Sequence, residues 1–214
     1  MLQRLLMALL ACSLIANTAV AEEDPQQVVI ATADKVLEEV TKRKAELEAD
    51  SSLIYPLVEV TVLPRFDFEA MTRSAMGRFW RNASSDQQQR IVVEFRELLV
   101  RTYATALLGY SGQQIEYPPM HVADGASKVM VPTKIRTEGG PPIPINYRLR
   151  ADDDGKWLVY DVVIDGISLV TNYRSTFARQ IQQGAAAEKN PAKRMAAGIE
   201  SLIEVLAAKN DKSA

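Results

Sequence analysis

Few side chains in this sequence have the types and spacing that catalysis or metal binding requires. The chain holds a single cysteine, Cys12, and a single histidine, His121, which excludes a disulfide framework, a cysteine–histidine nucleophile pair and zinc sites built from these residues. His121 lies in a proline-flanked loop with no obvious acidic partner. The sequence has no G-x-S-x-G, no P-loop and no dinucleotide-binding glycine pattern. We therefore expect no metal and no cofactor.

Asp161 and Asp165 are the carboxylates that come closest to a catalytic arrangement. They share a strand face with Trp157 and Val163, where loss of water would raise the pKa of an acid and make a general base conceivable. The alternative is structural, because an aspartate in such a place commonly pairs with an arginine or caps a turn. Asp165-Gly166 is typical of a strand-to-helix junction. We favour the structural interpretation and predict that the protein is not an enzyme.

Composition limits the class of protein further. The chain has 214 residues, of which 47% are hydrophobic and 24% charged, the balance of an ordinary soluble globular domain. Its net charge of −2 does not fit a general nucleic-acid binder.

The first 21 residues have the features of a signal peptide. Arg4 gives a positive start, an apolar run follows, and Ala19-Val20-Ala21 is an A-x-A cleavage site. An alternative is a lipoprotein site at Cys12, but the apolar run continues past that residue to the better cleavage signal. We expect an exported, periplasmic protein that begins at Glu22 and forms a single domain over residues 22–214.

Residues 25–108 are predicted to be mainly helical. Asp24 caps a helix that starts at Pro25 and runs to about residue 48, and residues 67–77 form a short helix. Residues 52–63 carry apolar spacing for a helix and β-branched residues for a strand, so both assignments stay open. Ser84 with Gln87, or Ser85 with Gln88, forms a capping box that opens a helix over residues 84–108.

After residue 113 the apolar residues alternate, which predicts a sheet over residues 113–166. Four strands are expected: Ile115–Tyr117, Ser127–Thr137, Ile143–Arg150 and Lys156–Asp165. Short turns between successive strands imply antiparallel pairing. Residues 167–209 form C-terminal helices, from Ser168 to Gln183 and from about Lys193 to Lys209. The expected fold is α+β, a twisted four-stranded antiparallel sheet with helices packed on one face.

Three ordered segments resemble one known family. They are residues 62–71 (VLPRFDFEAM) running on to Trp80, residues 98–104 (LLVRTYA), and residues 160–170 (YDVVIDGISLV) running on through residues 172–175 (NYRS). In this order and at these separations they are similar to the MlaC, or toluene-tolerance, family. The similarity covers residues 25–183, and residues 185–197 form an apparent insertion before a helix that resembles the family's last one.

The resemblance implies a periplasmic phospholipid carrier that holds its lipid between helices and sheet. In the family the carrier moves lipid between outer-membrane and inner-membrane Mla complexes and so maintains outer-membrane lipid asymmetry. The implied partners are a phospholipid, an inner-membrane MCE-domain protein with its ABC transporter, and an outer-membrane lipoprotein–porin complex. We expect a monomer.

Apolar side chains on the predicted helices and strands could line the lipid cavity. The candidates share an inward direction in the register assumed here; they are Met71, Met76, Phe95, Leu99, Tyr103, Val129, Val131, Ile145, Tyr147, Leu149, Val159 and Val163. For any single one of these residues, a place in an ordinary packed core is the more common alternative.

Five basic side chains on the opposite face of the strands form a candidate docking strip. They are Lys128, Lys134, Arg136, Arg148 and Arg150. The strip would attract acidic partners or anionic head groups, or it is a solvated sheet face. Two other classes of function stay open: a small-molecule isomerase or hydrolase on a similar cone-shaped fold, and a periplasmic chaperone that would bind apolar peptides with the same surfaces.

Overall fold

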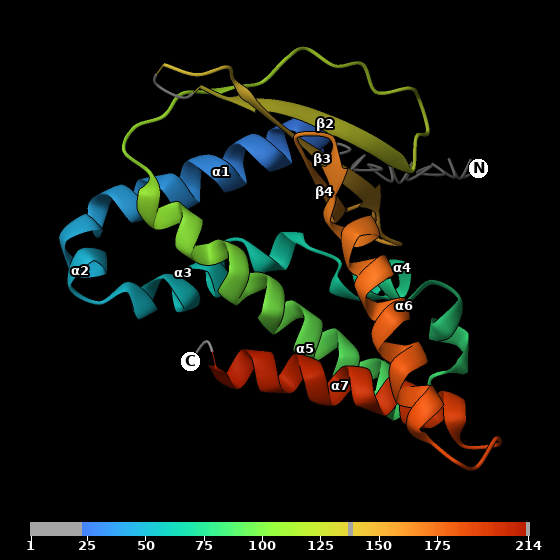
Figure 1. Cartoon of the computed structure of the whole chain (residues 1–214). Helices are drawn as coiled ribbons and strands as arrows, with labels where there is room; N and C mark the ends of the chain where they lie inside the picture. Colours follow the sequence, from blue (N-terminus) through green and yellow to red (C-terminus); the bar gives the residue numbers. More distant parts are fainter. Residues whose placement is uncertain (1–22, 137–138, 213–214) are drawn as a thin grey trace, which may run out of the picture.

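The computed structural model describes residues 23–136 and 139–212. A five-stranded sheet lies above a group of helices, and α1 passes beneath the sheet (Figure 1). The predicted signal peptide, residues 1–21, lies outside the described residues. Within the described part of the chain, no helix is long and apolar enough to cross a membrane.

Seven α-helices form in the described residues, and 3-10 segments connect several of them. The α-helices are α1 (Pro25–Lys42), α2 (Lys44–Ala49), α3 (Ile54–Thr61), α4 (Phe68–Met76), α5 (Ser85–Tyr103), α6 (Leu169–Ala187) and α7 (Arg194–Lys212). The 3-10 segments are η1 (Ser51–Leu53), η2 (Leu63–Arg65), η3 (Gly77–Asn82) and η4 (Ala104–Gly109). The sequence predicted one helix to residue 48, but the chain leaves helical geometry at Arg43 and divides it into α1 and α2.

Local signals explain where the helices start and stop. Asp24 accepts a hydrogen bond from the backbone N–H of Gln26 at 2.8 Å and caps α1, with Pro25 at its first position. The capping box forms with Ser84 and Gln87 rather than one residue later. The segment open to both assignments is helix α3, since its buried residues recur at helical spacing: Ile54, Leu57, Val58 and Thr61.

The sheet has five strands, one more than predicted. In spatial order it runs β1 (Ile115–Glu116), β2 (Lys128–Ile135), β3 (Ile143–Ala151), β4 (Trp157–Ile164) and β5 (Ile167–Ser168), all antiparallel. The extra strand is β5. Asp165 and Gly166 have φ values of 49° and 79° and form a hairpin turn, so the chain returns along β4 before α6 begins. The sequence predicted that Asp165-Gly166 leads directly from a strand to a helix, but the short strand β5 lies between them.

A β-bulge in β4 changes which side chains share a face. Arg148 pairs with Asp161 while the next residue, Leu149, pairs with Val159, so Tyr160 is an extra residue on β4. Beyond the bulge the inward positions of β4 move by one residue. Val162 and Ile164 then lie on the same face as Val159.

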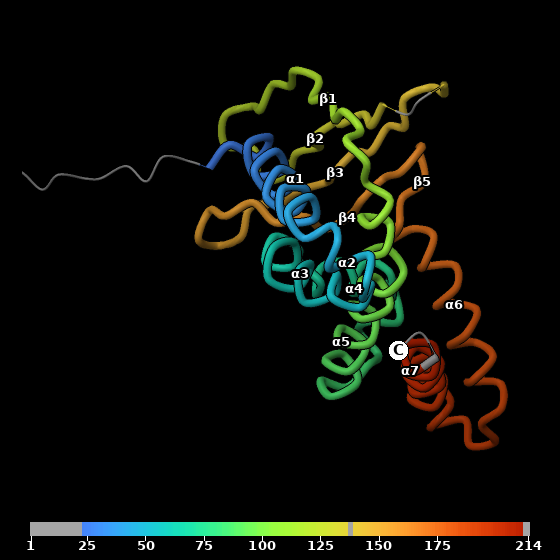
Figure 2. The backbone as a smooth tube through the Cα atoms, turned by 90° about the vertical axis from the view of Figure 1, so that its left-hand side faces the viewer, coloured from blue at the N-terminus to red at the C-terminus, as the bar shows by residue number. Residues whose placement is uncertain are grey.

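Helix α6 runs away from the sheet, and α7 returns beside it, so that the two form a closely packed hairpin whose turn lies far from the sheet (Figure 2). A Cβ at Gly184 would overlap the Ser201 side chain, and one at Gly198 would overlap the carbonyl oxygen of Ile181. The apparent insertion at residues 185–197 is partly helical, because α6 extends to Ala187 and α7 begins at Arg194.

The buried apolar residues form three clusters instead of one continuous core. The helical cluster joins α4, η3, α5, α6 and α7, and includes Phe95, Phe177 and Leu202. The sheet cluster joins the inner face of the sheet to Val28 and Val29 of α1. The third cluster joins α1 to α3 and η4. The sheet cluster and the helical cluster therefore have separate sets of fully buried residues.

Candidate functional site

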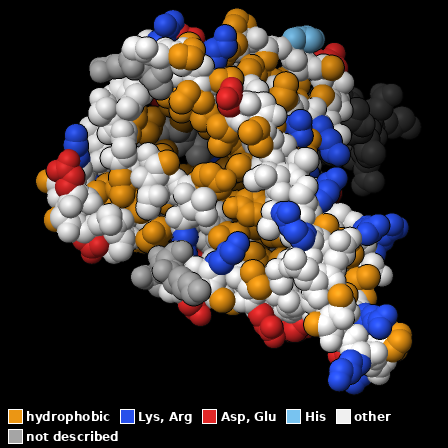
Figure 3. Space-filling view, in the orientation of Figure 1, with side chains coloured by type: hydrophobic (Ala, Val, Ile, Leu, Met, Phe, Trp, Pro, Cys, Tyr) orange, Lys and Arg blue, Asp and Glu red, His pale blue; other side chains and the backbone are white. Residues whose placement is uncertain are grey.

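A hollow opens between the sheet and the helices on the face seen in Figure 3, and hydrophobic side chains line it. The inner face of the sheet carries apolar side chains that pack against the sheet cluster yet stay only half-buried. Those on the sheet are Val129, Ile145, Tyr147, Ala151 and Ile164. Phe66, just before α4, packs against both the sheet cluster and the helical cluster and connects them.

The predicted lipid-binding residues separate into two groups. Met71, Met76, Phe95, Leu99, Val131, Leu149 and Val159 are fully buried within the helical or the sheet cluster. Val129, Ile145 and Tyr147 are half-buried on the inner face of the sheet, and Tyr103 is exposed near the end of α5. Ile145 and Tyr147 therefore keep part of their surface exposed on the inner face of the sheet, while Val131 has an exposed fraction of 0%.

Val163 does not share a face with the other candidates. It pairs with Asn146, a residue of the outer face, whereas Ile145 pairs with Ile164. Without the bulge, continuing the pairing from Leu149 and Val159 would place Val163 opposite Ile145, which is the register the sequence suggested. The prediction for Val163 was wrong because one extra residue on β4 reverses the parity beyond it.

Two inner-face residues of the sheet and one residue of α6 were missed at the sequence level. Val162 and Ile164 replace Val163 beyond the bulge, and Leu169 at the start of α6 packs against the sheet cluster. Asp165-Gly166 is a known hairpin signal and could have identified β5. Nothing in the alternation of Tyr160 with its neighbours identifies the bulge.

Burial affects the pKa of tyrosines that pack against the sheet cluster and the helical cluster. It raises the pKa of Tyr147 to about 12, with a smaller contribution from the neighbouring Tyr117. Burial also raises the pKa of Tyr173 on α6 to about 12; Tyr103 adds to this rise, and a hydrogen bond with Thr102 opposes it. The Tyr117 hydroxyl is buried without a hydrogen-bond partner. These phenols are therefore neutral at ordinary pH.

On the outer face, Asp161 connects the sheet to α6. Its carboxylate, with an exposed fraction of 3%, pairs with Arg148 at 3.0 Å and accepts hydrogen bonds from the Ser168 hydroxyl at 2.7 Å and the Val170 N–H at 3.2 Å. These are the partners of a structural carboxylate at a helix N-terminus. Of the two interpretations offered above for Asp161, the arrangement matches the structural one.

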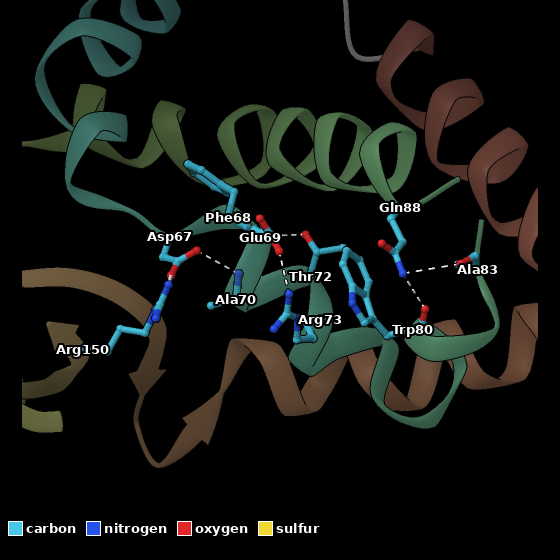
Figure 4. Close-up of polar contacts among 10 residues, drawn as sticks. All are labelled: Asp67, Phe68, Glu69, Ala70, Thr72, Arg73, Trp80, Ala83, Gln88 and Arg150. Carbon is cyan, nitrogen blue, oxygen red and sulfur yellow. Dashed lines mark hydrogen bonds and ion pairs between the residues drawn. The ribbon is translucent and has the colours of Figure 1, made fainter. Parts of the chain in front are cut away.

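Asp67 has the matching position before α4. It accepts a hydrogen bond from the Ala70 N–H at 2.8 Å and pairs with Arg150 from β3, as Figure 4 shows. Arg148 and Arg150 thus both project from the outer face of β3, and each binds a buried carboxylate at the start of a helix. The two ion pairs fasten α4 and α6 to the sheet.

The candidate docking strip is therefore not a row of unpaired cations. Arg136 pairs with Glu116, and Arg148 and Arg150 have the partners just described. Lys128 lies over the ring of Tyr160 at 5.8 Å, and Lys134 is exposed. The three arginines of the strip are thus balanced by neighbouring carboxylates, which weakens the strip as an electrostatic attractor.

A metal ion bound by the described residues would require a group of ligand side chains close together. Within residues 23–136 and 139–212, no group of three or more histidine, cysteine or acidic residues could hold a metal ion. A surface groove of about 430 Å³ runs along α1, and one of about 400 Å³ lies beside η3. Neither groove is lined by a residue of β2, β3 or β4.

Taken together, these features define a class of protein: an α+β binding protein with an apolar hollow between a curved sheet and a layer of helices. A family model described as MlaC protein matches residues 31–207. The chain therefore belongs to the MlaC family.

Individual relatives agree with this assignment. The chain is 26% identical over 159 residues to the intermembrane phospholipid transport system binding protein MlaC of Haemophilus influenzae, covering 73% of this chain and 74% of that protein. It is 28% identical over 165 residues to the toluene tolerance protein ttg2D of Pseudomonas putida, covering 77% and 76%. Among solved structures, a phospholipid-binding protein from Ralstonia solanacearum in complex with a phospholipid matches with a TM-score of 0.76 and 30% identity, covering 89% of this chain and 99% of that one.

Proposed function

We propose that this protein is a periplasmic phospholipid carrier that moves lipid between membrane complexes of the Mla type. The observation that carries the proposal is the apolar hollow, on a fold similar to that of a protein solved with a phospholipid. We assign its wall to the half-buried inner-face residues Ile145, Tyr147 and Ile164, with Leu169 from the start of α6. No enzymatic step is part of this function.

The energetics of acyl chains support transfer by contact. Two chains of about 14 methylenes each, at about 0.8 kcal/mol per buried methylene, give a gross transfer term near 20 kcal/mol. Much of this term replaces what a bilayer already supplied, so loading from a membrane is feasible while escape into water is extremely slow. Loading and unloading then need a partner that shields the chains, such as an inner-membrane MCE-domain protein or an outer-membrane lipoprotein–porin complex.

Extraction of the purified protein tests the proposal. The protein is purified from the periplasm of its source, extracted with organic solvent, and the extract analysed by mass spectrometry. We expect a phospholipid in near-stoichiometric amount, and we expect Ile145→Arg to reduce it strongly. Val93→Arg, at an exposed aliphatic position on the outside of α5, is the matched control. Absence of lipid would refute the carrier, and apolar peptides in its place would favour a chaperone.

The same preparation tests the proposed export. An intact mass that begins at Glu22 is expected if the signal peptide is cleaved after Ala21. A mass that begins at an acylated Cys12 would show a lipoprotein instead.

A further inference from the structure

One end of the sheet presents isoleucine on every strand. In the outer row, Ile115 pairs with Ile135 and Ile135 pairs with Ile143. In the next row, Ile145 pairs with Ile164 and Ile164 pairs with Ile167. Paired residues point to the same face, so all six side chains lie on the inner face. We call these six residues the isoleucine end.

The isoleucine end is not buried by the rest of the described chain. At the opposite end of the sheet, Val28 and Val29 of α1 cover Val131, Leu149 and Trp157, which are fully buried. None of the six isoleucines reaches that state. Four are half-buried, and Ile143 and Ile167 have exposed fractions of 40% and 63%.

The isoleucine end also lacks unsatisfied polar groups. Thr133, which pairs with Ile145, is the one polar side chain in the two rows, and its hydroxyl donates to the Ile145 carbonyl at 2.7 Å. Glu116, Lys134 and Arg136 alternate with these rows and lie on the outer face, where Arg136 pairs with Glu116. An aliphatic surface without charge or free hydrogen-bonding groups loses little when it leaves water.

From this arrangement we propose that the isoleucine end is a membrane-contacting rim, which touches the apolar layer of a bilayer while lipid enters or leaves the hollow. The inference rests on the proposed function and adds a partner, the lipid surface itself. The second of the two rows contains Ile145 and Ile164, which also belong to the proposed wall of the hollow. A lipid that enters at the rim therefore moves from the bilayer to the hollow over apolar surface all the way.

A lipid surface fits the rim better than a specific protein partner does. Protein interfaces need roughly 1,200 Å² or more of buried surface and about one hydrogen bond per 100–200 Å². The rim offers two strongly exposed aliphatic side chains and no free polar group in its two rows. A bilayer requires neither shape complementarity nor hydrogen bonds.

The test measures uptake of lipid from vesicles without any other protein. Phosphatidylcholine vesicles carrying a self-quenched fluorescent phospholipid are mixed with lipid-stripped protein, and dequenching gives the transfer rate. The double variant Ile143→Ser, Ile167→Ser removes the exposed part of the rim. The control is Val60→Ser, Val93→Ser, which makes the same type of change at aliphatic positions with exposed fractions of 73% and 63% on α3 and α5.

We expect the rim variant to take up lipid roughly tenfold more slowly than the wild type, because contact with the bilayer loses two inserted side chains. Its unfolding midpoint and its lipid content at equilibrium stay unchanged, and the control keeps the wild-type rate. A wild-type rate in the rim variant would overturn the proposal, as would loss of lipid at equilibrium, which would make the rim part of the binding wall.

Lipid uptake by the wild-type protein distinguishes failure of the membrane rim from failure of the carrier function. If it takes up no lipid from vesicles but is purified with phospholipid bound, the carrier function stands, the membrane rim is refuted, and a protein surface must supply the lipid. If neither vesicles nor the native compartment load the protein with lipid, the proposed function fails as well.

Discussion

The helical layer and the inner face of the sheet contain similar apolar residues, but those of the helical layer are closely packed and those of the sheet face are partly exposed. Between α6 and α7, glycine lets two backbones approach, and on α5 Phe95 packs edge-on against Tyr173 and Phe177 at ring-centre distances of 4.9 and 5.0 Å. On the sheet, the row from Ile145 to Ile167 stays reachable by solvent. The difference shows that apolar content does not decide what becomes core. What decides is whether a second element lies close enough to cover the surface.

The fastened helices explain how the hollow stays open. Asp67 and Asp161 hold the starts of α4 and α6 to Arg150 and Arg148 on the outer face of the sheet. This places the attachment points on the side of the sheet that faces away from the hollow. The helices are therefore held at the sheet without having to fill its inner face.

The strongest test of this comparison places the same charge on both kinds of surface. Val131→Arg buries a cation in the packed part of the sheet and should lower the free energy of unfolding by about 3–5 kcal/mol. Ile145→Arg faces the hollow, where the long side chain reaches water, and should cost about 1 kcal/mol or less while displacing lipid. Urea unfolding of both variants, with lipid content measured alongside, checks the pair. Equal destabilisation would show that the hollow is closed and packed.

A smaller effect is expected where the helical layer is tightest. Gly198→Ala adds a methyl group against the Ile181 carbonyl, which should separate α6 from α7 and cost about 1–3 kcal/mol. Gly109→Ala, in η4, meets no atom within 4 Å and should change stability by about 0.5 kcal/mol or less. Thermal unfolding compares the two. A neutral Gly198→Ala would mean that the helix pair is looser than described.

The outer-face ion pairs come next in size. Arg148→Ala leaves the buried carboxylate of Asp161 without its cation, and should cost about 2 kcal/mol because the arginine is itself partly exposed. Lys134→Ala removes an exposed cation from the same face and should be nearly neutral. Urea midpoints and lipid transfer are measured for both. If Arg148→Ala slows transfer without loss of stability, the arginine acts in docking after all.

Most of the fold could be predicted from the sequence because its signals are local. The caps at Asp24 and Ser84, the end of α4 at Gly77 and the strands of the meander all follow from residues a few positions apart. The faces of β4 could not be predicted, since the bulge at Tyr160 depends on how two strands meet. Similarly, no local pattern shows that α1 covers Val131 and leaves Ile145 open.

The smallest expected effect appears only at high pH and concerns Tyr147. Its folded-state pKa is about 12, against 10 in an unfolded chain, so the unfolded state releases the phenol proton first. The stability that the neutral phenol contributes is present below pH 10 and is lost as the pH rises from 10 toward 12. At pH 11 the expected loss is about 1 kcal/mol, after allowance for partial exposure.

Tyr147→Phe should abolish this part of the alkaline destabilisation and change little at pH 7. Urea unfolding of wild type and variant at pH 8 and pH 11 measures the difference, and an identical fall in both would show that Tyr147 titrates normally.

The comparison of the two regions becomes sharper when the wild type is titrated with and without bound lipid, using the absorbance of the phenolate. Lipid in the hollow excludes water from the Tyr147 ring, so the lipid-loaded protein should ionise this residue at a higher pH than the stripped protein. Tyr173, at the border of the helical cluster, should shift less because its burial comes largely from packed side chains that do not leave with the lipid.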